Sequence, residues 1–136
     1  MKENMKKLMR EAGLDYGERT HTFNSRLAQE LGKWADVQNG ESDIHNLIYR
    51  AYFVEGKNIS DVNELLRIAK KAGFDKRAAK EVLEKRSFKS LVDADWQESR
   101  EFGITGVPTF QYNQNLLVGC QPYEMLERFI DRQTNS

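Results

Sequence analysis

The sequence predicts a helix-dominated α+β fold. Seven segments carry apolar residues at the three-to-four-residue spacing of an amphipathic helix. One later stretch instead predicts two short strands, residues 110–112 and 116–118, which are joined by a turn at residues 113–115. Because a lone hairpin is only marginally stable in water, we expect it to pack on the last helix.

The expected helices follow the apolar periodicity and end at glycines or turn residues. They cover residues 1–14, 24–40, 42–56, 60–73, 75–83, 89–102 and 122–130. Ser42-Asp43 and Ser60-Asp61 are the expected N-caps of two of them, since their side-chain oxygens can accept the unpaired amide hydrogens of a first turn. Pro122 suits the first turn of the last helix.

Composition narrows the class of protein. The chain has 136 residues, the size of one domain, and 31% of them are charged with a formal net charge of zero. A neutral chain has no long-range field that recruits nucleic acid or an anionic membrane. No apolar run reaches the roughly 20 residues of a membrane span, and no signal-peptide core follows the N-terminal lysines. The single cysteine, Cys120, rules out an internal disulfide framework, so we expect a reducing, cytoplasmic location.

The most informative stretch is residues 106–110, Gly-Val-Pro-Thr-Phe. It places Pro108, one of two prolines, at the entry to the expected hairpin. Proline cannot donate a ladder hydrogen bond, so it belongs at the first residue of a strand or on an edge. The bond before a proline is also the peptide bond at which the cis form costs little.

Four stretches resemble one known family. Residues 103–110, GITGVPTF, resemble the cis-proline loop of DsbA-like thioredoxin-fold proteins, which include FrnE-type oxidoreductases and the 2-hydroxychromene-2-carboxylate isomerases. Three further motifs resemble the family in the same order: NSRLA at 24–28 followed by ELG at 30–32, RAYFVEGKNI at 50–59, and GCQPY at 119–123. On these motifs the chain is identified as a member of this family.

The resemblance implies a partial thioredoxin-like fold. Residues 1–102 would form the helical insertion of the DsbA type, and residues 103–136 the C-terminal thioredoxin-like portion with the cis-proline loop, the β-hairpin and the last helix, together one compact unit. The family's redox centre is a Cys-x-x-Cys motif on a helix that follows a first strand, and this sequence shows neither. We therefore expect a truncated member that lacks the N-terminal half and has no complete catalytic set of its own.

The resemblance also implies a substrate-binding loop at Val107, Pro108 and Thr109. In the family the peptide bond before the proline is cis, and the backbone of the preceding residue, here Val107, pairs with an extended substrate. A trans proline that only shapes the strand entry is the alternative.

Two further residues have both a functional and a structural interpretation. Asn24 matches a family position that faces the active-site groove and, in the isomerases, contributes to substrate or glutathione binding; we favour a plain N-cap. Cys120 precedes a helix whose N-terminus could activate a thiol, but we favour its packing as a small hydrophobe. His21 and His45 lack metal-ligand spacing, so no metal site is expected.

The leading hypothesis is a thiol–disulfide oxidoreductase of the DsbA/FrnE type that acts on protein thiols or disulfides in a full-length form. The Cys-x-x-Cys half would then be encoded upstream or lie on another chain. The alternative is a non-catalytic helical remnant, and a glutathione-dependent isomerase is the weaker alternative; otherwise no cofactor is expected. The unpaired hairpin edge predicts a homodimer, with neither nucleic acid nor a membrane as a partner.

Overall fold

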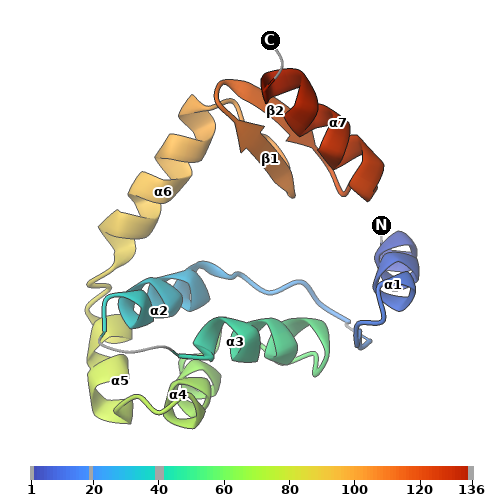
Figure 1. Cartoon of the computed structure of the whole chain (residues 1–136). Coiled ribbons are helices and arrows are strands. Elements are labelled where there is room, and N and C mark those ends of the chain that lie inside the picture. The colour runs from blue at the N-terminus through green and yellow to red at the C-terminus, as the bar shows by residue number, and fades with distance from the viewer. Residues whose placement is uncertain (1, 19, 39–41, 135–136) are drawn as a thin grey trace. The chain divides into compact units, whose positions relative to one another are not determined.

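A computed structural model of the chain describes residues 2–18, 20–38 and 42–134. Within these ranges it contains seven helices and two strands (Figure 1). In chain order they are α1 (Lys2–Glu11), α2 (Arg26–Asp36), α3 (Ile44–Phe53), α4 (Val62–Lys71), α5 (Lys76–Glu84), α6 (Lys89–Glu101), β1 (Thr109–Tyr112), β2 (Asn115–Val118) and α7 (Tyr123–Thr134). The predicted helix-dominated α+β fold is confirmed.

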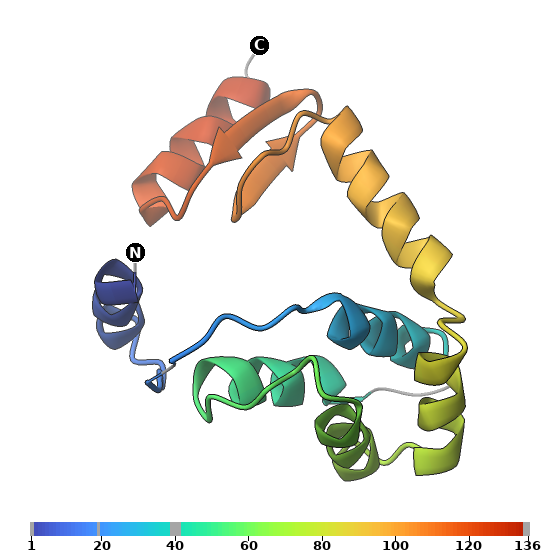
Figure 2. The same ribbon diagram turned by 180° about the vertical axis from the view of Figure 1, so that it is seen from behind.

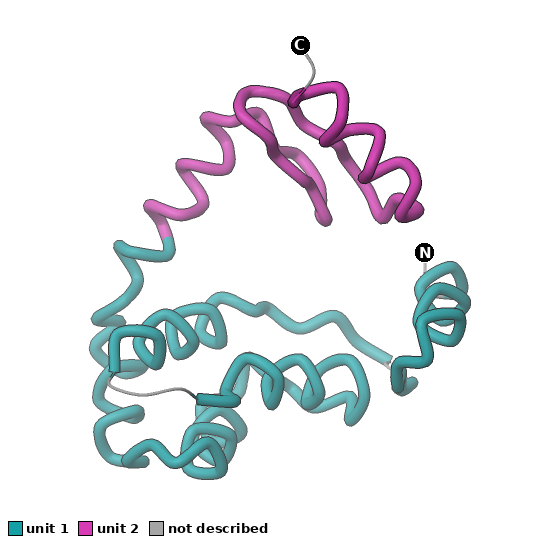
Figure 3. Tube along the Cα trace, viewed as in Figure 1, with its two compact units in different colours: residues 1–92 teal, residues 93–136 magenta. Residues whose placement is uncertain are grey.

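The chain divides into two compact units, Met1–Val92 and Asp93–Ser136, so that the boundary falls within α6 (Figure 3). This boundary lies ten residues before the one expected from the family motifs, between residues 102 and 103. The expected assignment of 1–102 to a helical insertion, and of both parts to one compact unit, stays a prediction.

The first unit holds the hydrophobic core, which is built from α2, α3, α4 and α5. Helix α2 contacts each of the other three, and α4 contacts both α3 and α5. Leu31, Ile44, Leu65 and Ile68 are fully buried at the centre. Their sequence spacing follows the helical period, which is why these segments could be recognised from the apolar pattern.

Two of the expected helix caps can be compared directly. The Asp61 carboxylate accepts a hydrogen bond from the Asn63 backbone N–H at 3.0 Å, as expected at the start of α4. The expectation for Asp43 was wrong, because its side chain makes no capping hydrogen bond with α3. Its carboxylate accepts instead from the side-chain amide of Asn46 at 2.7 Å.

The loop that follows α1 packs tightly on the end of α3. The Gly17 backbone N–H donates to the Phe53 carbonyl at 2.8 Å. A Cβ atom on Gly17 would lie 1.8 Å from the Val54 carbonyl oxygen, which is backbone and cannot move aside. Glycine is therefore required here by close approach, and it holds the loop against the RAYF motif of α3.

The second unit contains residues 93–101 of α6, the antiparallel hairpin and α7. The hairpin and α7 lie next to each other in both views (Figure 2). The register pairs Thr109 with Val118 and Tyr112 with Asn115, which leaves a two-residue turn. The Asn115 side-chain amide bonds to Gln133 of α7, so the expected packing of the hairpin on the last helix is confirmed.

No described residue of the second unit is buried. The apolar spacing of residues 89–102 predicted a helix with an inward or half-inward apolar face, but of its large apolar residues only Val92 is buried, while Leu91, Trp96 and Phe102 are 45%, 47% and 47% exposed. A hairpin and one helix offer too little surface to cover them. Among the described helices, none combines the length and apolarity that a membrane crossing requires.

Candidate functional site

The loop that enters β1 is held by two hydrogen bonds. The Thr109 hydroxyl donates to the Gly106 carbonyl at 2.6 Å, and the Gly119 N–H donates to the Pro108 carbonyl at 2.8 Å. The peptide bond between Val107 and Pro108 is cis. Between these anchors the Val107 side chain is 91% exposed. The loop therefore presents one apolar side chain to solvent from a fixed backbone.

One edge of β1 is open among the described residues, because β1 pairs with β2 alone. Hydrogen-bonded and non-hydrogen-bonded pairs alternate along an antiparallel ladder. Since Pro108 accepts from Gly119, the N–H and C=O groups of Thr109 and Gln111 face away from β2. Val107 lies just before this open edge, in the bend that precedes the strand.

Cys120 lies one residue beyond the partner of Pro108. Gly119, with φ of 95°, ends β2 and turns the chain toward α7. The thiol that follows is exposed, so the expected packing of Cys120 as a small hydrophobe is wrong.

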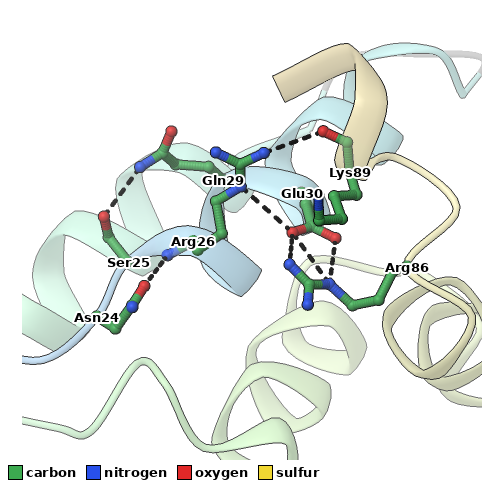
Figure 4. A network of polar contacts seen from close by, with 7 residues as sticks. All are labelled: Asn24, Ser25, Arg26, Gln29, Glu30, Arg86 and Lys89. Carbon is green, nitrogen blue, oxygen red and sulfur yellow. Dashed lines mark hydrogen bonds and ion pairs between the residues drawn. The ribbon is translucent and has the colours of Figure 1, made fainter. Parts of the chain in front are cut away.

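Asn24 lies in the first unit and caps α2. Its side-chain oxygen accepts the Arg26 backbone N–H at 2.8 Å, one residue before the N-cap position of Ser25 (Figure 4). The Ser25 hydroxyl accepts from the Gln29 side-chain amide at 2.9 Å. Asn24 thus satisfies one backbone amide of the first turn of α2, whereas Ser25, at the N-cap position, accepts no backbone amide with its side chain.

A buried ion pair one turn further along α2 was not predicted from the sequence. The Glu30 side chain is fully buried, and Arg86 donates to both of its oxygens, with Nε at 2.9 and 3.2 Å and Nη2 at 2.5 Å (Figure 4). Arg86 adopts a left-handed backbone with φ of 52°. Only the strong charge of Glu30 within an otherwise apolar helix face could have indicated a partner, and nothing in the sequence identifies Arg86 as that partner.

Arg26 extends this network to the start of α6. Its Nε lies 3.5 Å from the Glu30 carboxylate, and its Nη2 donates to the Lys89 backbone carbonyl at 3.0 Å. The opening of α2 is therefore tied to the junction between α5 and α6. Buried charges persist in proteins when they are paired and hydrogen-bonded, so this network has a structural explanation.

Each of the two histidines has a polar neighbour of its own. His45 Nε2 lies 2.7 Å from an Asp36 carboxylate oxygen, and its ring lies over Gly32, where a Cβ would come within 2.8 Å of Cε1. His21 bonds to the neighbouring Thr20 hydroxyl at 2.8 Å. In the part of the chain that is described, no three His, Cys, Asp or Glu side chains are grouped closely enough to hold a metal ion.

The fold and its loop define a class of protein, the thioredoxin-like proteins of the DsbA type. The chain belongs to the DSBA-like thioredoxin domain family, whose model matches residues 1–131. The predicted family is therefore confirmed.

Two similar proteins show how much of this chain, and how much of each relative, is aligned. The uncharacterised protein YwbO of Bacillus subtilis (strain 168) is 28% identical over 105 residues, which are 76% of this chain and 52% of that protein. A solved structure of selenomethionine 2-hydroxychromene-2-carboxylate isomerase aligns with a TM-score of 0.77 and 19% identity, over 98% of this chain and 65% of that one. The chain thus spans about half the length of the curated relative, and the isomerase structure supports the fold alone.

Proposed function

We propose that this chain is the substrate-binding part of a thiol–disulfide oxidoreductase of the DsbA/FrnE type. In this proposal Val107, Pro108 and Thr109 bind an extended segment of a protein substrate, and the redox-active cysteine pair lies outside these 136 residues. The observation that carries it is the open edge of β1 beside the exposed Val107. Extended peptides add to such edges through main-chain hydrogen bonds, with adjacent side chains giving specificity.

The chemistry of thiol–disulfide exchange is the reason for placing the redox centre outside these 136 residues. When a substrate dithiol becomes a disulfide, it gives up two electrons and two protons, and the disulfide of the enzyme accepts them to become a dithiol. The 136 residues contain one cysteine and so cannot hold that disulfide internally. Cys120 is not needed for the proposed role. Thiol exchange of this kind is compatible with a cytoplasmic location, which we propose on the cysteine content.

The principal alternative is a non-catalytic protein that self-associates through its hairpin. The same open edge of β1 supports it, because a second copy could pair there as readily as a substrate. A glutathione-dependent isomerase is the weaker alternative. The Asn24 side chain, the candidate contact in that reading, is already engaged as a cap of α2.

Peptide binding tests the proposal without any redox step. The probe is a fluorescein-labelled insulin B chain with its cysteines carboxymethylated, titrated with the folded chain and followed by anisotropy. We expect saturable binding that weakens at least about tenfold in Gln111→Pro, equivalent to about 1.4 kcal/mol, because proline removes an amide at the open edge and not in the ladder to β2.

Gln111→Ala is the matched control. It removes the same side chain, including its 2.9 Å hydrogen bond to the Asn113 carbonyl, but keeps the backbone amide. We expect its affinity to stay near that of the unsubstituted chain. Equal weakening in both variants, or no saturable binding at all, would contradict substrate binding at this edge. A loss of self-association in Gln111→Pro without any peptide binding would favour the alternative.

A further inference from the structure

The chain is neutral overall, but its two units carry net charges of opposite sign. Residues 1–92 contain 18 lysines and arginines and 14 acidic residues, a net charge of +4. Residues 93–136 contain three basic and seven acidic residues, a net charge of −4. Each unit therefore has a field of its own, although the whole chain has none at long range.

The positive charge is concentrated where α4 ends and α5 begins. Lys70 and Lys71 form the last turn of α4, and Lys76 and Arg77 open α5. All four side chains are exposed, and none forms an ion pair with another described residue. We call these four residues the basic face.

The other cations near the basic face are already engaged. Lys85 lies 2.6 Å from Glu81, whose side-chain hydrogen bond and charge raise the pKa of the lysine. Lys80 pairs more loosely with Glu84, at 3.9 Å. An open hollow of about 530 Å³ is lined by Lys76, Arg77, Lys80 and Asp75. Asp75 also caps α5, because one of its carboxylate oxygens accepts the Arg77 backbone N–H at 3.2 Å.

The negative charge of the second unit includes a stripe on α7. Glu124, Glu127 and Asp131 recur at helical spacing and so share one face over roughly 10 Å. Their side chains are exposed and have no ion-pair partner among the residues that the structure describes. Tyr123 and Ile130, 73% and 48% exposed, lie beside them along the helix. We call the three carboxylates the acidic stripe.

We propose that the basic face of one copy binds the acidic stripe of a second copy. The charges are opposite and of similar number, and both surfaces are free of internal ion pairs in the described chain. Because every copy carries both surfaces, two such contacts can close a symmetric dimer. The contact also gives a partner to the second unit, in which no described residue is buried.

The charge distribution favours this arrangement over pairing between two hairpins. Hairpin-to-hairpin pairing brings two units of −4 together, so their repulsion opposes association at low salt. Contact between the basic face and the acidic stripe brings +4 to −4. Since salt screens charges over a Debye length of about 10 Å at 0.1 M, the two arrangements respond to salt in opposite directions.

Molar mass by light scattering at 20 and 500 mM NaCl tests the proposal on the purified chain. We expect a mass near twice 15.8 kDa at low salt that falls toward 15.8 kDa at high salt. The paired reversals Lys76→Glu with Arg77→Glu, and Glu124→Lys with Glu127→Lys, should each raise the dissociation constant more than tenfold. Mixing the two reversed proteins should restore the assembly, because the contact is then rebuilt with its charges exchanged.

Glu3→Lys with Glu11→Lys is the matched control for Glu124→Lys with Glu127→Lys, since it makes the same change in net charge on α1 and should leave the mass unchanged. Circular dichroism of each variant identifies those that do not fold. A monomer at both salt concentrations contradicts the proposal, as does a dimer that strengthens with salt and ignores the reversals. A monomer that binds heparin through Lys76 and Arg77 would assign the basic face to a polyanion instead.

Discussion

Glu30 is a charged residue that lies buried in the core of the first unit. Its side chain is fully buried, whereas its main partner Arg86 keeps 40% of its side chain exposed. The two ends of the pair are therefore unequal. If Glu30 is removed, Arg86 can turn to water; if Arg86 is removed, a carboxylate stays in the interior with only the 3.5 Å contact to Arg26.

This inequality predicts different effects of two substitutions. Arg86→Ala should lower the free energy of unfolding by about 3 kcal/mol, because breaking a buried pair strands a charge. Glu30→Gln should lower it by about 1–2 kcal/mol, since the amide keeps the volume and one hydrogen-bond acceptor. Urea unfolding followed by circular dichroism measures both. Equal losses, or a larger loss for Glu30→Gln, would show that Arg86 is not holding an otherwise stranded carboxylate.

Arg67→Ala is the control for the loss of an arginine as such. Arg67 pairs with Glu64 three residues earlier on α4, where the Arg67 side chain is 49% exposed and that of Glu64 19% exposed. A partly exposed pair of this kind contributes about 1 kcal/mol or less. The difference in unfolding free energy between Arg86→Ala and Arg67→Ala therefore measures the effect of burying the partner carboxylate.

At the scale of the element, the starts of the helices in the first unit differ in a way that the sequence alone does not show. Three aspartates occupy N-cap positions, Asp43 before α3, Asp61 before α4 and Asp75 before α5. Asp61 and Asp75 have extended backbones, with ψ near 120°, and accept an amide two residues on. Asp43 has ψ of 14°, and its side chain accepts no backbone amide of α3.

We therefore expect Asp61→Ala to cost about 1 kcal/mol of stability and Asp43→Ala clearly less. Both aspartates lie at the first residue before a helix, so the pair is matched for residue type and for position. The midpoint of urea unfolding, with an unchanged slope, reports the difference. A cost for Asp43→Ala as large as that for Asp61→Ala would mean that interaction with the helix dipole, and not the hydrogen bond, dominates.

At the scale of the whole molecule, local signals predicted the helices, the hairpin and the family. Apolar spacing located the core face of α4, including Leu65 and Ile68, because that face is buried against neighbouring helices. The same spacing misassigned Trp96 of α6, since periodicity reports amphipathicity and not whether a partner is present.

Contacts between residues far apart in the chain could not be predicted from the sequence. Glu30 and Arg86 are 56 residues apart, and no pattern in the chain joins them. The motifs could predict a candidate site at Val107, Pro108 and Thr109, because these residues are contiguous in the chain. The open edge beside them follows from the register of the hairpin, which the turn residues predicted only approximately.

The most direct test of the central claim is insulin reduction by dithiothreitol, followed by turbidity, with this chain and with Cys120→Ser. In the proposed function these residues bind the substrate, and the cysteine pair lies outside them. Both proteins should therefore leave the rate at that of dithiothreitol alone. A clear acceleration that disappears in Cys120→Ser would contradict the account, because it would make the exposed thiol of this chain the reacting group.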